Sequence, residues 1–231
     1  MANSFENEQT KPEFETIANL AEDLILRLPG CTDVMVRKTL QATYREFARH
    51  SCVFHTVRRL PIVGNECCFG PTLPDMYVDA VTDVRIGNRK LVLKHEYDIV
   101  GNGKIVILGC PNYDMGDGDE ALKFIVDAAD IQPEFKRFGV PHLHVTCVEV
   151  PKSGSETAPS WFLEKYGEAI VSGVLWKLMS MTGKAWSDPA QAAVEKVNYD
   201  NFMNEARVNY ANGSQYGSGD AGRAVDTSVI I

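Results

Sequence analysis

The chain of 231 residues lacks any hydrophobic run near the length of about 20 residues that a membrane-spanning helix needs. It begins with the polar and acidic stretch MANSFENEQTKPEFE, which lacks the apolar segment of a secretory signal peptide. It also contains no P-loop, no G-x-S-x-G and no Ser-His-Asp motif. These absences argue against a membrane-spanning or secreted protein, and no recognised motif supports an enzymatic function.

The chain also has no excess of basic residues over acidic ones. The 23 Lys and Arg residues are outnumbered by 31 Asp and Glu residues, which gives a formal net charge of −8 at pH 7. Basic residues gather only in the short stretches VRRLP and FKRFG, and sparse pairs of this kind are usually solvated surface. Nothing in this balance favours binding to a phosphate backbone.

The six cysteines do not predict disulfide bonds. Cys67 and Cys68 are adjacent, the chain is not small, and no secretion signal is present. We therefore expect reduced thiols in a cytoplasm, with Cys67 and Cys68 as buried thiols.

The acidic stretch DMGDGDE, at 114–120, does not have the ligand spacing of a calcium-binding loop and is interpreted as an acidic turn.

Two histidines provide the strongest candidate for a metal site. His142 and His144 are two residues apart in HLHVTCVEV, so both side chains point to one face of a predicted strand. No third ligand is evident, and a protein site normally needs at least three. The sequence thus predicts no catalytic, metal-binding or cofactor-binding residue and no cofactor. The alternative is a small soluble metal-binding protein or enzyme that uses His142 and His144.

The hydrophobic period divides the chain into helical and extended segments. A period near 3.6 predicts helices at about 13–28, 33–50, 160–182 and 189–211. Between about 53 and 150 the period approaches 2, and the glycine-asparagine turns in GNRK and GNGK favour antiparallel hairpins. The predicted fold class is α+β: a four-helix bundle with an inserted antiparallel β subdomain and an extended C-terminal tail.

The same pattern predicts four parts along the chain. They are a flexible N-terminus at 1–12, a helical bundle domain at 13–52 and 159–212, an inserted β subdomain at 53–158 and a C-terminal arm at 213–231. The arm combines the linker GSQYGSGDAGRA with the apolar end VDTSVII. We expect it to be mobile in the free protein and to become ordered against an adjacent subunit or another protein.

Regular apolar stripes identify the residues expected in the helical core. Such stripes recur at intervals of three and four residues, and each needs a neighbouring element to cover it. Their members are Phe14, Ile17, Ala18, Ala21, Leu24, Ile25 and Leu28; Val36, Leu40, Tyr44, Phe47 and Ala48; and Leu163, Tyr166, Ile170, Val174, Leu178 and Met181.

Gly167 and Gly173 lie inside the predicted helix at 160–182, although glycine costs about 1 kcal/mol relative to alanine in a helix interior. Val171, Leu175 and Trp176 make this helix apolar on a second face, so it should be covered on more than one side. We interpret both glycines as points where a neighbouring helix backbone approaches closely.

A sharp corner follows in the sequence MTGKAWSDPAQ. Gly183 suits the left-handed position just after the helix, and Ser187 or Asp188 can cap the next helix with Pro189 at its first position. Trp186 is predicted to fill the corner between the two helices. The segment is therefore predicted to be an αα-hairpin with both ends specified.

The stretch WFLEKYGEAIVSGVLWKLMSMTGKAWSDPAQA, followed by Phe202 and EARVNYA, resembles the head-to-tail adaptor (connector or neck) proteins of tailed bacteriophages, which include the tail tubular protein of short-tailed phages. The likeness is strongest over 159–212. These proteins have an aromatic-rich helix with a small-residue core, a tryptophan and proline at the corner, and a second helix with a phenylalanine and an EAR-type segment. The matching positions are Tyr166, Ala169, Ile170, Gly173, Leu178, Trp186, Pro189, Phe202, Ala206 and Arg207.

The resemblance implies a structural virion protein and not an enzyme. Members of that family form a homo-oligomeric ring, commonly twelve-fold, beneath the portal protein at the capsid vertex. The implied partners are further copies of the chain, the portal, and tail or nozzle proteins, with no membrane. Genome DNA would pass through the ring without sequence-specific binding, and an acidic wall suits such passage. The implied location is the head–tail junction of the virion, after assembly in the cytoplasm of a bacterial host.

Overall fold

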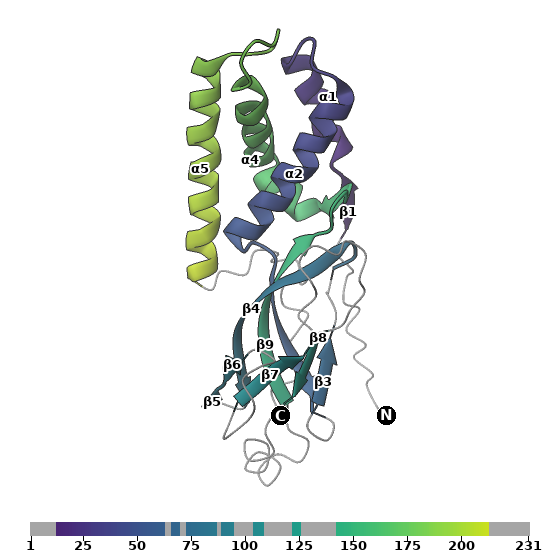
Figure 1. The fold of residues 1–231 in the computed structure, drawn as a ribbon, viewed down its shortest axis with the longest axis vertical. Helices are drawn as coiled ribbons and strands as arrows, with labels where there is room; N and C mark the ends of the chain where they lie inside the picture. The colour runs from purple at the N-terminus through teal and green to yellow at the C-terminus, as the bar shows by residue number, and fades with distance from the viewer. Residues whose placement is uncertain are drawn as a thin grey trace, which may run out of the picture. The chain divides into compact units, whose positions relative to one another are not determined.

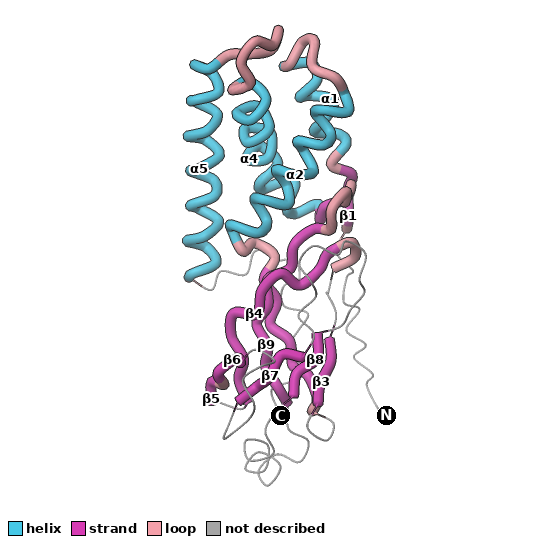
Figure 2. The backbone as a smooth tube through the Cα atoms, in the orientation of Figure 1, coloured by secondary structure: helices cyan, strands magenta, loops and turns pink. Residues whose placement is uncertain are grey.

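The computed structural model describes residues 13–62, 66–69, 73–86, 89–94, 104–108, 122–125 and 142–212. Within these ranges the protein combines helices with small sheets, so the predicted α+β class is confirmed (Figures 1 and 2). The predictions for the N-terminus at 1–12, the acidic turn at 114–120 and the C-terminal arm at 213–231 fall outside the described residues.

The four predicted helices are present. They are α1 (Ala18–Arg27), α2 (Asp33–Ser51), α4 (Ser160–Met179) and α5 (Pro189–Ala211). α1 starts later than its hydrophobic stripe indicated, because Phe14–Thr16 forms the strand β1. β1 pairs antiparallel with β10 (Thr157–Pro159), and the amide of Ser160 extends this pairing by donating to the carbonyl of Glu13 at 2.9 Å. The prediction of helix for 13–17 was therefore wrong.

The remaining strands form two sheets of four strands each within the described residues. The first has the order β2-β9-β4-β5 and is antiparallel throughout, whereas the second has the order β3-β8-β7-β6. β6 and β7 pair in parallel, contrary to the antiparallel prediction. The strand bounds are β2 His55–Pro61, β3 Glu66–Phe69, β4 Met76–Ile86, β5 Arg89–Lys90, β6 Val92–Lys94, β7 Lys104–Leu108, β8 Leu122–Ile125 and β9 His142–Pro151.

One of the two predicted glycine-asparagine hairpins is confirmed. Ile86 of β4 pairs with Arg89 of β5, so the two residues after Ile86 connect antiparallel strands, as the GNRK stretch predicted. The GNGK turn falls outside the described residues. Cys67 and Cys68 lie in β3, and their predicted burial also falls outside what the structure describes.

The chain divides into two compact units. One comprises Met1–Tyr44 with Glu156–Ile231, and the other comprises Arg45–Ser155. The boundary therefore falls inside α2 and again just before β10. The first unit holds α1, α4, α5 and most of α2, and the second holds the two four-stranded sheets.

Most residues of the predicted apolar stripes are buried, and the others are half-buried. In α2 the five stripe residues from Val36 to Ala48 are at most 1% exposed. The ring of Tyr44 lies 5.1 Å from that of Phe162 on α4, and Phe162 lies 5.7 Å from Tyr166. α4 is buried on several sides, as its two apolar faces predicted, because it packs against α1, α2 and α5.

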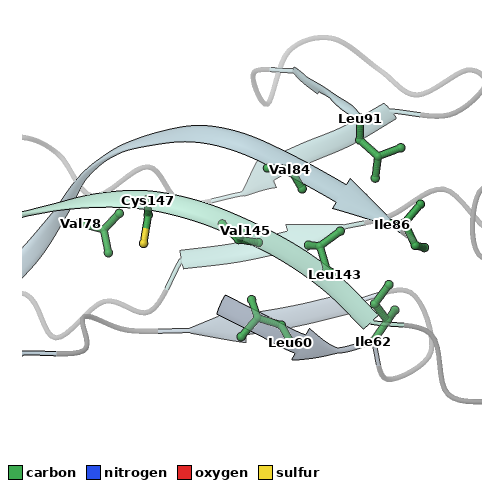
Figure 3. Close-up of a cluster of buried hydrophobic side chains, with 9 residues drawn as sticks. All are labelled: Leu60, Ile62, Val78, Val84, Ile86, Leu91, Leu143, Val145 and Cys147. Atoms are coloured by element: carbon green, nitrogen blue, oxygen red, sulfur yellow. The ribbon is translucent and has the colours of Figure 1, made fainter. Parts of the chain in front are cut away.

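A separate hydrophobic cluster holds the sheet β2-β9-β4-β5 together. Leu143, Val145 and Cys147 alternate along β9 and so project from one face of the sheet, where residues of the neighbouring strands join them (Figure 3). The full cluster comprises Leu60, Ile62, Val78, Val84, Ile86, Leu91, Leu143, Val145 and Cys147.

The two glycines of α4 have different surroundings. A Cβ added at Gly173 would lie 2.6 Å from Cγ2 of Thr43 on α2 and 2.7 Å from the ring of Tyr199 on α5. Gly173 is thus a close-approach point, although side chains and not a helix backbone occupy the space. At Gly167 the nearest atom would be Cδ2 of Leu20 at 3.8 Å, an ordinary contact, so the prediction for Gly167 was wrong.

This difference predicts opposite effects for two identical substitutions. Gly173→Ala should lower the free energy of unfolding by about 1–3 kcal/mol, because overpacking of a tight contact outweighs the gain in helix propensity. Gly167→Ala, the matched control on the same helix, should leave stability unchanged or raise it by up to about 1 kcal/mol. Chemical denaturation of the full chain measures both. A Gly173→Ala protein as stable as the Gly167→Ala protein would contradict the account.

Candidate functional site

The corner between α4 and α5 is built by specific capping interactions. α4 ends at Met179, and the carbonyl of Met179 accepts a hydrogen bond from the amide of Asp188 at 3.0 Å. The Asp188 carboxylate accepts from the amide of Gln191 at 3.0 Å, and Pro189 occupies the first turn of α5. Of the two predicted caps, Asp188 is therefore the one used.

Gly183 and Trp186 differ in part from their predictions. Gly183 has a left-handed backbone with φ of +73°, but α4 ends too early for it to occupy the position directly after the helix. Trp186 is half-buried, so it fills the corner less completely than predicted. A Cβ added at Gly30, in the turn between α1 and α2, would lie 3.9 Å from Cε3 of Trp186. The indole thus lies close to that turn.

The residues that carry the resemblance to phage adaptors are mainly packing residues. Five of them lie buried in α4: Tyr166, Ala169, Ile170, Gly173 and Leu178. On α5, Ala206 is buried and Phe202 is half-buried, whereas Arg207 is exposed. The Trp176 ring of α4 also lies 5.9 Å from the Tyr199 ring of α5. This hairpin is therefore a closely packed pair of helices, which can present an outer surface.

His142 and His144 lie on the face of the sheet opposite the hydrophobic cluster. Their directions alternate with those of Leu143 and Val145, which are fully buried. His144 pairs across the strands with Arg59 of β2 on one side and Arg85 of β4 on the other. Nη2 of Arg59 also lies 3.4 Å from Nδ1 of His142. The two histidines thus share a face, as predicted, with cationic neighbours.

An acidic residue on this face is already engaged. Asp83 forms ion pairs with Arg85 and with Lys90, the latter at 2.9 Å. Burial alone would raise the pKa of Asp83, but the hydrogen bonds from Lys90 and Arg85 outweigh it and lower the pKa. Among the residues that the structure describes, no three His, Cys, Asp or Glu side chains are placed to hold a metal ion.

A second polar cluster connects the last turns of α2 to β4. Arg49 contacts the carboxylate of Asp79 at 2.7 Å and the hydroxyl of Tyr77 at 2.6 Å. The same hydroxyl accepts from Arg45 at 2.9 Å and donates to Asp79 at 3.2 Å. The hydrogen bond to Asp79 is the main reason that the pKa of Arg49 is raised. The sequence did not indicate this cluster, because its members are about 30 residues apart in the chain.

A third polar cluster is enclosed beside the hydrophobic residues of β9. The Thr56 hydroxyl donates to Oε1 of Glu149 at 3.3 Å and lies 3.1 Å from Sγ of Cys147. The amide of Leu73 donates to Oε2 of Glu149 at 3.2 Å. Because Thr56 donates to the carboxylate, its oxygen remains to accept from the Cys147 thiol. These contacts satisfy a carboxylate whose residue has no solvent exposure.

The chemistry of Cys147 follows from this enclosure. Burial raises the pKa of the thiol to about 11, and the nearby Glu149 charge acts in the same direction, while Thr56 and Arg58 oppose it. A thiol with so high a pKa stays protonated at neutral pH and is a poor nucleophile. The Cys147 thiol is thus a structural element of the sheet and not a nucleophile at neutral pH.

No described helix combines the length and the apolar character needed to cross a bilayer. No family model matches the chain, and no curated protein matches its sequence.

The buried thiol predicts a specific pH dependence. Above the ordinary cysteine pKa near 9, the unfolded chain loses the Cys147 proton while the folded chain retains it up to about pH 11. The unfolded state is then favoured, so stability falls as pH rises through this window. Wild type should lose about 2 kcal/mol more than Cys147→Ala between pH 9 and 11, by the usual conversion of a pKa difference into free energy. Urea denaturation across this range measures it, and parallel losses in both proteins would contradict the assignment.

Proposed function

We propose that this protein is a structural virion protein of a tailed bacteriophage, a head-to-tail connector that forms a ring between the portal and the tail. The observation that carries the proposal is the α4–α5 hairpin. Its buried small and aromatic residues, its tryptophan and its proline-initiated second helix resemble the pattern expected of phage adaptor proteins. The pattern is one of packing, which suits a protein whose task is assembly.

The division of the chain supports the same proposal. The Arg45–Ser155 unit interrupts a helical unit that the two ends of the chain build together. We interpret this as a four-helix bundle of α1, α2, α4 and α5 with an inserted β subdomain and a C-terminal arm. A bundle of this kind is a rigid base for contacts between subunits.

The proposed partners follow from the function. They are further copies of the chain in a ring of twelve, the portal protein on one side, and tail or nozzle proteins on the other. Genome DNA would pass through the ring during ejection without sequence-specific contacts, and the net charge of −8 suits a wall that does not hold DNA. The protein would be assembled in the cytoplasm of the bacterial host and reside at the head–tail junction, away from any membrane.

The surroundings of His142 and His144 do not favour the alternative of a metal-binding protein or enzyme. Arg59 and Arg85 flank His144, and like charges oppose the binding of a metal cation beside them. Zinc sites built on histidine are normally completed by cysteine, further histidine or carboxylate. The carboxylate on this face, Asp83, is instead paired with two basic residues.

Deletion of residues 213–231 tests the proposal through the C-terminal arm. The truncated protein should keep its melting temperature within a few degrees, since a stability change under about 1 kcal/mol moves the melting temperature only slightly in a chain of this size. It should nevertheless fail to attach to filled capsids, because the arm is proposed to bind an adjacent subunit, the portal or a tail protein. Attachment is measured by sedimentation of capsids after complementation of a phage that lacks the protein.

A second variant distinguishes the effect of the arm's length from the effect of its apolar end. Replacement of Val229, Ile230 and Ile231 by serine keeps the length and removes the apolar end. It should reduce attachment as the deletion does, since the apolar end is proposed to make the contact. Infectious particles at the wild-type level with the truncated chain would show that the arm is dispensable.

A further inference from the structure

α5 has two opposite faces of different character. Its inner face packs against α4 through Ala192, Tyr199, Met203 and Ala206, all of which are buried. Figure 1 shows α5 at the edge of the helical unit, with α4 beside it. The opposite face of α5 is exposed among the described residues, although it is not the charged surface expected of a helix that faces only water.

The outer face has a regular uncharged pattern. Seven exposed positions follow one another at alternating intervals of four and three residues over about 32 Å of helix. None of them carries a charge, and the three valines are 53–58% exposed. The positions are Ala190, Val194, Val197, Asn201, Asn204, Val208 and Ala211.

This spacing is that of a coiled-coil seam. A mean interval of 3.5 residues keeps a stripe facing one partner helix, and polar asparagines within such a stripe fix the register. The flanking positions beside the centre of the stripe are charged or polar, as in coiled coils: Asp200 and Arg207 lie along one edge, and Asn198 and Glu205 lie along the other. The outer face of α5 is thus suited to a second helix of matching pattern.

We propose that this second helix is α5 of another copy of the chain, packed antiparallel along the outer face. One register matches the polar positions: Asn201 lies opposite Asn204 of the second copy, and Val197 lies opposite Val208. Two asparagines can satisfy each other by hydrogen bonds in a partly desolvated seam. A shift by one heptad in either direction places an asparagine opposite a valine and leaves its amide unpaired, so this register is preferred.

The charges select the antiparallel direction. In the matched register Asp200 of each copy approaches Arg207 of the other, which gives two equivalent attractive pairs. Glu205 approaches Asn198, so the other edge brings no like charges together. In a parallel pair, by contrast, Asp200 would approach Glu205 of the second copy on both edges, which is repulsive. Charge complementarity thus identifies a second copy as the occupant of this face.

The resulting contact is two-fold and closes as a dimer, whereas a cyclic ring needs two different surfaces on each subunit. The α5 pair therefore describes the chain in solution before ring assembly, and it stands or falls independently of the connector proposal. Pairing of this kind would keep the subunit from assembling until the pair dissociates.

Sedimentation equilibrium of the purified full-length chain under reducing conditions tests the contact. Wild type should be a dimer, and Val197→Asp should raise the dimer dissociation constant about tenfold or more, because a charge is then placed in the seam. Val34→Asp is the matched control, since Val34 is a valine of similar exposure, 62% against 58%, on α2. Its dimer should match that of wild type, with circular dichroism confirming that both variants are folded.

Charge reversal tests the register and direction. Asp200→Arg and Arg207→Asp should each weaken the dimer, because each places like charges together twice. The double variant Asp200→Arg with Arg207→Asp should restore the dimer towards the wild-type dissociation constant. The proposal is overturned if wild type is monomeric, if it forms only assemblies larger than a dimer, or if the double variant remains as weak as the single ones. Attachment to capsids, measured separately, tests the connector proposal and not this contact.

Discussion

The close contact at Gly173 is the constraint on which the helical unit depends. At this point a side chain of α2 and an aromatic ring of α5 reach α4 from two directions, and neither leaves room for a methyl group. Thr43 is also the acceptor for the ammonium of Lys177 at 3.0 Å, so the same residue fixes a polar group of α4 one turn further on. Burial of Tyr44, Phe162 and Tyr166 follows from this approach, because the helices can enclose the aromatic rings only when they lie close together.

Both proposals rely on this interior. Because α4 and α5 pack closely together, one face of α5 is buried against α4 and the opposite face is exposed. The low charge of the available face would be costly in a protein that works alone, since exposed apolar surface favours association. It is reasonable in a chain that exists to assemble. The polar clusters of the Arg45–Ser155 unit have a different role, because they join strands to one another and, through Arg49 and Asp79, join β4 to the end of α2.

Much of the fold could be predicted from the sequence because local periodicity determined it. The four helices and the strands β2, β4 and β9 follow from apolar residues at intervals of about 3.6 or 2, and the Asp188 and Pro189 cap follows from local chemistry. Local patterns could not predict β1, whose partner β10 lies about 140 residues away, and its apolar Phe14 resembled the start of a helix. The parallel pairing of β6 with β7 likewise depends on the path of the chain.

The surroundings of individual residues were predicted less completely, because they too depend on parts of the chain that are distant in the sequence. Gly167 and Gly173 look alike in the sequence, and only the positions of Leu20, Thr43 and Tyr199 distinguish them. The burial of Glu149 could have been predicted from the alternation of HLHVTCVEV, which places Glu149 on the same side of the strand as Leu143 and Val145. The outer stripe of α5 was also visible as a heptad, but it could be recognised as exposed only once α4 was known to cover the opposite face.

Quantitative mass spectrometry of purified phage particles is the most direct test of the proposal that the chain is a virion connector. A connector should be present in mature virions at a one-to-one ratio with the portal protein, since both would form rings of the same copy number at one vertex. The connector should also remain in particles after the tail is removed. Absence of the chain from purified virions, with abundant protein in the infected cell, would rule out the connector proposal.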